Sequence, residues 1–279
     1  MSASPKGSHH FPTKQAQLDD AAAQPAMIWN PLRQRRQSPD VSLAQWRQVE
    51  AQLPFLARLS PADQAALREM ALRFIASKEW HGAHGLALAA EMQLSIALQA
   101  CLPVLRLGLH WYDGWVGIVV YPGDFVIPRS EMDADGVVHE YDDAVLGEAW
   151  EGGPVLLSWF DDPGAVAGIN IVIHEFAHKL DMRNGVADGM PPLEGATSAQ
   201  QWRSAFAPAY ADFCRRVDRG EDTLLDPYAA ESPAEFFAVM SEAFFETADL
   251  LFEEYPRVYA QLALFYRQEP RADGAMIAT

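Results

Sequence analysis

The chain has 279 residues, about half of them apolar, and a net charge of −17. It is long and apolar enough to bury a globular core. The excess of acid argues against nucleic acid or an anionic membrane as the main partner, because both reward basic surfaces. No apolar run approaches the ~20 residues of a membrane span, and no secretory signal is visible. We expect a cytoplasmic protein.

The N-terminal part is predicted to be a polar tail followed by helices. Residues 1–39 are rich in Ser, Pro, Gln and Ala, which predicts a mobile tail. Apolar residues follow a helical spacing from Leu43. Ser60-Pro61 is typical of a helix start, and a further apolar helix is expected over 86–100.

The middle of the chain predicts short strands, and helical periodicity returns after it. Branched and aromatic residues bounded by Gly, Pro or Asp indicate strands, and later apolar spacings indicate helices. The expected strands are 115–121, 137–141 and 155–160, and the expected helices are 169–182, one through Trp202 and Phe213, and 233–250. This order predicts an α+β fold, with a single domain over 40–268 and a C-terminal tail over 269–279.

His174-Glu175-Phe176-Ala177-His178 forms an HExxH motif. On a helix, positions i and i+4 lie about 40° apart around the axis, so both imidazoles can bind one ion. Glu175 lies on the same flank, close enough to act as general base on a water molecule held by Zn²⁺. The motif interrupts an apolar stretch, where three buried polar groups would be costly without a metal.

A catalytic zinc site needs a third protein ligand, and the motif has no third His downstream. We therefore expect a carboxylate from a second helix. The downstream acids are Glu194, Glu221, Glu231, Glu235, Glu242 and Glu246. Glu235 and Glu242 lie two turns apart on one predicted helix.

Glu235 has a second interpretation. Ser232-Pro233-Ala234-Glu235 matches a capping box, in which the Glu235 side chain would bond the backbone N–H of Ser232. The pattern alone leaves ligand and cap open, with Glu242 as the outside candidate.

Several segments resemble the Mlc titration factor A family. Members of this family are bacterial zinc metallopeptidases with a lethal-factor-like active site. The resemblance covers about 55–252. Its carriers are Ala100-Cys101-Leu102-Pro103-Val104-Leu105, Val120-Tyr121-Pro122, Gly147-Glu148-Ala149-Trp150, Leu157-Ser158-Trp159 and HEFAHKLDMRNGVADGMPPL from His174 to Leu193.

The resemblance implies a zincin-like (gluzincin) domain that binds one zinc ion per chain. It implies His174, His178 and a downstream Glu as ligands, with Glu175 as the base. A Tyr stands seven residues before the ligand Glu in lethal-factor-like sites, and Tyr228 and Glu235 satisfy that spacing. On this resemblance Tyr228 becomes the candidate oxyanion donor. The resemblance also implies aminopeptidase-type activity and binding of the Mlc repressor, which links the chain to glucose uptake.

Two classes of function stay open: a working peptidase that cleaves a peptide substrate, or a binding protein that sequesters a repressor. An intact Glu175 beside two ligand histidines favours the peptidase, because a structural zinc site needs no base. Residues 153–160 could form a sheet edge that pairs with substrate, or an interior strand. Asp181 and Glu242 could each orient an imidazole, although Asp181 could instead pair with Lys179 or Arg183. His81, His84, His110 and His139 lack ligand spacing.

Overall fold

The structure is a computed structural model that describes residues 41–123, 125–132, 138–159, 170–194 and 198–271. The described residues all fall within one compact unit, 36–279. The expected N-terminal tail lies outside them, as do 272–279 of the expected C-terminal tail. Within 269–271, Glu269 contacts Tyr259 and Arg271 pairs with Asp249.

The first helices begin where serine side chains cap them. Ser42 caps α2 (Leu43–Ala51), and Ser60 caps α3 (Pro61–Ser77), the second of which the sequence predicts as a helix start. A 3-10 turn, η1 (Pro54–Arg58), joins them.

The third helix, α4 (Ala90–Cys101), begins four residues later than predicted. The chain doubles back before it in η2 (Ala83–Gly85), where His84 and Gly85 have positive φ. A Cβ on Gly82 would lie 1.9 Å from the Leu86 carbonyl oxygen. This tight turn ends at Leu86, and residues 86–89, which the apolar pattern assigned to the helix, follow it without helical structure.

Four strands form a mixed sheet in the order β1-β2-β6-β5. They are β1 (Glu79–Gly82), β2 (Gly117–Pro122), β6 (Val155–Trp159) and β5 (Gly147–Ala149). The first three are parallel, and β5 pairs antiparallel with β6. The predicted strand 155–160 is therefore interior, and the possibility that it forms the sheet edge is wrong. Among the described residues, β1 and β5 lie at the two edges of the sheet, and Gly147 of β5 lies opposite Leu157 of β6.

A separate antiparallel hairpin joins β2 to β5. Its strands are β3 (Phe125–Met132) and β4 (Val138–Val145). The predicted strand 137–141 falls mainly in β4, whereas β1, β3 and β5 were not predicted. The short 3-10 turn η3 (Leu109–Tyr112) precedes β2.

Helices make up most of the rest of the described chain. They are α5 (Ile171–Asp181), η4 (Met182–Asn184), α6 (Ala199–Asp218), η5 (Pro227–Ala230), α7 (Pro233–Glu246), α8 (Ala248–Glu254) and α9 (Pro256–Tyr266). The predicted helix 233–250 is two helices, because Thr247 leaves the helical region at φ −127° and ψ 48°.

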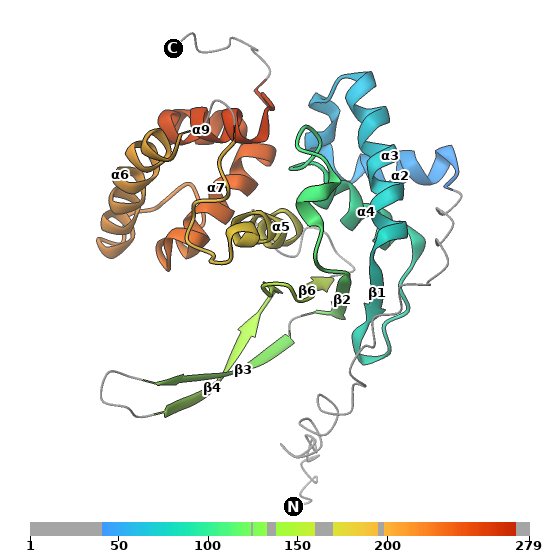
Figure 1. Cartoon of the computed structure of the whole chain (residues 1–279), viewed down its shortest axis with the longest axis horizontal. Helices are drawn as coiled ribbons and strands as arrows, with labels where there is room; N and C mark the ends of the chain where they lie inside the picture. Colours follow the sequence, from blue (N-terminus) through green and yellow to red (C-terminus); the bar gives the residue numbers. More distant parts are fainter. Residues whose placement is uncertain (1–40, 124, 133–137, 160–169, 195–197, 272–279) are drawn as a thin grey trace, which may run out of the picture. The chain divides into compact units, whose positions relative to one another are not determined.

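Helix α5 lies at the centre of this arrangement. It packs against the sheet through β5 and β6, against α4, and against α7 (Figure 1). Phe176 and Leu180 of α5 are fully buried, as are Phe237 and Phe244 of α7. The two helices are therefore fixed by a shared apolar core, which also fixes the polar side chains between them.

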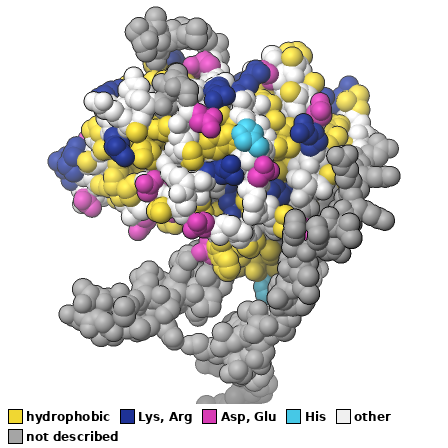
Figure 2. Space-filling view, viewed as in Figure 1, with side chains coloured by type: hydrophobic (Ala, Val, Ile, Leu, Met, Phe, Trp, Pro, Cys, Tyr) yellow, Lys and Arg dark blue, Asp and Glu magenta, His cyan; other side chains and the backbone are white. Residues whose placement is uncertain are grey.

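The described surface carries charges of both signs. On the face in Figure 2, Asp and Glu side chains are interspersed with Lys and Arg. No helix in the described part of the chain is long and apolar enough to cross a membrane.

Candidate metal centre

Asn170 defines the start of the motif helix. Its side-chain oxygen accepts from the Ile173 amide at 2.9 Å, which caps α5. Its backbone N–H donates to Glu242 Oε2 at 2.6 Å, and its side-chain amide donates to Glu246 Oε1 at 2.7 Å. The predicted start of this helix at residue 169 lies outside the described residues. Asn170 thus ties the first turn of α5 to the last turns of α7.

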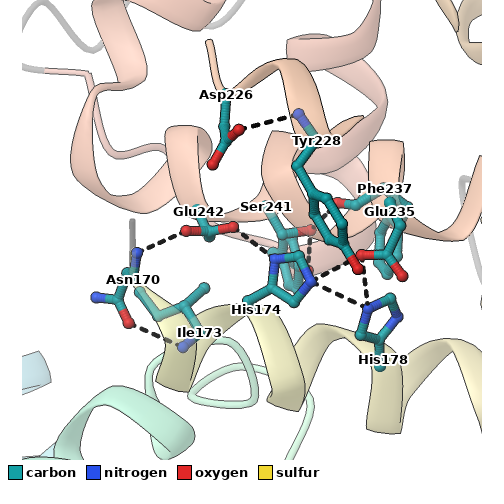
Figure 3. Close-up of polar contacts among 11 residues, drawn as sticks. Asn170, Ile173, His174, His178, Asp226, Tyr228, Glu235, Phe237, Ser241 and Glu242 are labelled. Carbon is teal, nitrogen blue, oxygen red and sulfur yellow. Dashed lines mark hydrogen bonds and ion pairs between the residues drawn. The ribbon is translucent and has the colours of Figure 1, made fainter. Parts of the chain in front are cut away.

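Three donor atoms from two helices converge above α5 (Figure 3). His174 Nε2 lies 3.1 Å from His178 Nε2, and Glu235 Oε2 lies 2.9 Å from the first and 3.2 Å from the second. We call these three atoms the donor triangle. His174 and His178 lie one turn apart on α5, as the spacing predicts. Tertiary packing brings Glu235 to them.

Glu235 and Ser232 divide the two roles that the capping-box pattern left open. Ser232 Oγ accepts from the Glu235 amide at 3.1 Å and so caps α7. The Glu235 carboxylate contacts both imidazoles, and no described bond returns it to the Ser232 amide. The cap needs only the backbone of Glu235, so its side chain is available to the histidines.

Glu242 orients one imidazole. Its Oε1 lies 2.7 Å from His174 Nδ1, and both residues are buried. A carboxylate partner favours the proton on Nδ1, so the lone pair of Nε2 faces the donor triangle. Glu242 is therefore placed behind a donor atom, and it lies outside the triangle.

The carboxylates give this site a strong preference for positive charge. Burial would by itself lower the pKa of His174, but Glu235 and Glu242 raise it well above its ordinary value. Burial would raise the pKa of Glu235, but its bonds to the two histidines hold that pKa at about 2. Both shifts reflect a negative potential at the donor triangle.

These residues fit a metal ion. His174 Nε2, His178 Nε2 and Glu235 Oε2 lie within 3.2 Å of one another, and three such potential ligand atoms form an arrangement that a cation would stabilise. Tetrahedral zinc with bonds of about 2.0–2.1 Å places its ligand atoms about 3.3 Å apart, and the triangle edges are 2.9–3.2 Å. Two His and one Glu is also the ligand set of catalytic zinc sites that keep one position open.

Glu175 lies buried beside the triangle and faces the edge strand. A Cβ on Gly147 would come within 2.6 Å of Glu175 Oε1. Burial raises the pKa of Glu175 to about 8; Glu235 adds to this and His174 opposes it. Glu175 Oε2 has no hydrogen-bond partner among the described residues. The carboxylate is thus a strong proton acceptor held close to, but outside, the donor set.

Tyr228 reaches the same site from η5. The Asp226 side chain accepts from its backbone N–H at 2.9 Å and starts this 3-10 turn. Its ring centroid lies 6.1 Å from that of His174, and the side chain is half-exposed. The Tyr228 ring extends from η5 toward His174 and His178 (Figure 3).

Other candidates lie away from the triangle or act differently. His81, His84 and His110 fall on β1, η2 and η3, outside the donor set, and the side chain of His139 is not described.

Asp181 accepts from the Gly189 amide at 2.7 Å, whereas Lys179 donates to backbone carbonyls. The expected pairing of Asp181 with Lys179 or Arg183 is therefore not found among the described contacts. The Asp181 bond instead fixes the loop after α5.

The sequence matches the glucose-regulated metallo-peptidase M90 family over residues 29–267. The chain belongs to this family. Mlc titration factor A of Klebsiella pneumoniae (strain 342) is 39% identical over 229 residues, which cover 81% of this chain and 86% of that protein. Mlc titration factor A of Yersinia pestis (strain Pestoides F) is 38% identical over 235 residues, with 82% and 86% coverage. The resemblance stated from the sequence is confirmed.

The matched family is described as one of metallo-peptidases, which suggests a metal ion, and the matched region contains the whole donor triangle. Sequence reasoning did not single out three residues of this chain that contact the motif helix or lie on it: Asn170, Gly147 and Lys179. Asn170 carries a helix-cap signal, and Gly147 lies in a segment already noted for its resemblance. Lys179 has no sequence signal beyond being a charge in an apolar helix.

Proposed function

We propose that this chain is a zinc-dependent metallopeptidase of zincin-like (gluzincin) fold with aminopeptidase-type activity. One zinc ion would be held by His174, His178 and Glu235. The observation that carries the proposal is the buried carboxylate of Glu175, which lies next to a three-donor set and outside it. A structural metal site has no use for such a group.

The protein's own groups supply proton transfer and orientation. A zinc ion bound at the triangle would supply Lewis acidity towards a water molecule and the scissile carbonyl. Glu175 would accept the proton of the attacking water at Oε2 and deliver it to the leaving amine. Burial raises the pKa of Glu175 above that of an ordinary carboxylate, which makes it a stronger proton acceptor for the first step.

Two further features would bind the substrate. The phenolic O–H of Tyr228 would donate to the oxyanion that develops on the substrate carbonyl. Strand β5 lies against Glu175 and at the edge of the described sheet, so an extended peptide could pair with its backbone. We also infer that 40–268 is one metallopeptidase domain and that the protein acts in the cytoplasm.

The test is hydrolysis measured together with metal content. Wild-type protein should bind one zinc per chain and cleave amino-acid 4-nitroanilides or short peptides. Glu175→Gln should keep the zinc and the fold but lose roughly 10³-fold in kcat, because it removes the proton acceptor. Zinc-loaded wild type that cleaves no member of a broad peptide panel would overturn the peptidase proposal.

The assignment of the third ligand has its own test. His174→Ala and Glu235→Ala should each lose most of the zinc. Full zinc occupancy in Glu235→Ala, with loss in Glu242→Ala, would contradict this assignment.

A second function is supported by the names of the relatives. Both compared proteins are called Mlc titration factor A, so we propose that this chain also binds an Mlc-type repressor. A protein interface of roughly 800 Å² per partner extends well beyond a catalytic cleft. Glu175→Gln should therefore still capture the repressor in a pull-down. Loss of capture with zinc retained would mean that the repressor occupies the cleft as a substrate.

A further inference from the structure

Lys179 is a buried cation whose ammonium group donates hydrogen bonds to two backbone carbonyls. The residue is 4% exposed. Its Nζ donates to the Trp150 carbonyl oxygen at 2.5 Å and to the Gly153 carbonyl oxygen at 2.8 Å. It also lies 4.7 Å from the centroid of the Trp115 ring. A charge-assisted bond to two carbonyls is strong, and burying the ammonium without them would be costly.

Both carbonyls belong to the turn that links the edge strand β5 to β6, which we call the 150–153 turn. The Gly153 amide donates back to the Trp150 carbonyl at 3.0 Å, and Gly152 has φ +60°. The Trp150 amide donates to the Pro154 carbonyl at 3.2 Å. Lys179 on α5 therefore stabilises this turn by donating hydrogen bonds to its first and last carbonyl oxygens.

Helix α5 thus holds the edge strand at both ends. At one end, Gly147 lies in contact with Glu175. At the other, Lys179 binds the turn that follows Ala149. Glu175 and Lys179 are one helical turn apart, so they lie on the same flank of α5. The strand's position relative to the carboxylate is therefore set by a single rigid helix.

Lys78 provides a matched comparison within the same core. It is 5% exposed, donates to the Tyr112 and Trp115 carbonyls at 2.7 and 2.8 Å, and lies 3.6 Å from the same Trp115 ring. Its burial, its two carbonyl partners and its aromatic neighbour match those of Lys179. The difference is that its carbonyls precede β2, an interior strand.

We infer that Lys179 is a positioning residue for substrate. It fixes the edge strand β5, together with the half-exposed Trp150 ring at the end of that strand, and the two form one wall of the peptide-binding cleft. The inference rests on the proposed peptidase function. Lys179 touches neither the donor triangle nor the reacting atoms. Its contribution should therefore appear in substrate binding rather than in metal binding or chemistry.

The experiment compares Lys179→Met with Lys78→Met in the full-length protein. Zinc content, kcat and KM for an extended quenched peptide, and hydrogen exchange of the fragments covering 146–154 and 109–116 would be measured for each. Both variants leave two carbonyls without their donor, so both should lose stability to a similar degree. Lys179→Met should keep one zinc and its kcat but raise KM by about tenfold, since backbone pairing with β5 contributes equally to binding of the substrate and of the transition state. It should also lose amide protection in 146–154. Lys78→Met should keep the wild-type KM and lose protection only in 109–116.

Equal KM values in the two variants would reduce Lys179 to a packing residue and overturn the inference. Loss of zinc, or a fall in kcat without a change in KM, would also overturn it, because Lys179 would then act through the motif helix. If zinc-loaded wild type cleaves no peptide, the proposed function fails. Hydrogen exchange then still decides whether Lys179 holds the strand, because an unchanged 146–154 fragment in Lys179→Met contradicts that directly.

Discussion

The Glu175 side chain lies directly against the backbone of Gly147, a residue 28 positions earlier on the edge strand. A methyl group at Gly147 would come within 2.6 Å of Glu175 Oε1 and 2.7 Å of its Cγ. Cγ is not the far end of the side chain, so the clash cannot be relieved by a small rotation. Glycine is required here for close approach and not for an unusual backbone angle, because its φ is not among the positive values.

Gly147→Ala should therefore displace Glu175 and lower kcat. We expect a loss of about 10²-fold, the typical cost of moving a reacting group by about 1 Å, with zinc content unchanged. Gly117→Ala is the control, since its Cβ would meet only Pro154, the residue before β6, at 3.1 Å. Wild-type kcat in Gly147→Ala would show that the carboxylate can work from a shifted position.

Glu242→Gln should weaken zinc binding while leaving all three ligands in place. The amide can no longer draw the Nδ1 proton of His174 as a carboxylate does. Loss of such a partner typically costs about 10–100-fold in metal affinity. Chelator competition measures this. Glu246→Gln is the control, because Glu246 bonds Asn170 one turn further along α7 and its described bonds do not reach either histidine. Equal affinities in the two variants would contradict the role of Glu242.

Tyr228→Phe should lower kcat by about 10²-fold with zinc retained, since it removes a donor needed mainly in the transition state. Tyr210→Phe separates this effect from a loosening of η5. The Tyr210 hydroxyl donates to the Ala230 carbonyl at the end of that turn. A change confined to KM in Tyr228→Phe would instead make Tyr228 a substrate-binding residue.

Because of the lowered pKa of Lys78, the free energy of unfolding should increase as pH rises above neutral. Burial, with a smaller contribution from Lys179, lowers its pKa from 10.5 to about 7. Between these two values the unfolded chain holds the proton and the folded protein does not, so the free energy of unfolding increases with pH. The expected gain is about 2 kcal/mol between pH 7 and pH 9.

Urea unfolding of wild type and Lys78→Met at both pH values measures this gain. The wild type should gain more stability than the variant, by about that amount. A parallel pH dependence in the two proteins would mean that Lys78 keeps its ordinary pKa in the fold.

The sequence pattern is sufficient to predict the part of the site that lies on one helix. The i, i+4 spacing of His174 and His178 places both imidazoles on one face, whatever the rest of the fold does. Local signals also located the starts of α2 and α3, the first through apolar spacing from Leu43 and the second through Ser60-Pro61, because both act within a few residues. The α+β class followed from the alternation of strand and helix periodicity.

The edges of elements could not be predicted in the same way. Strands β1 and β5 have four and three residues, which is too short for a period of two to stand out. The late start of α4 and the break at Thr247 depend on how the chain turns back on itself, which a local apolar pattern does not record.

Which distant groups meet at the site depends on how the helices and the sheet pack. Glu235 contacts His174 across 61 positions and Glu242 contacts it across 68. On its own helix, Glu235 satisfies a capping pattern as well as a ligand pattern. Packing of α7 on α5 resolves this, because the buried core between them directs both carboxylates at one imidazole. The contacts of Gly147 with Glu175 and of Lys179 with the 150–153 turn arise in the same way. They depend on where the sheet edge lies against α5, and no periodicity within either segment encodes that distance.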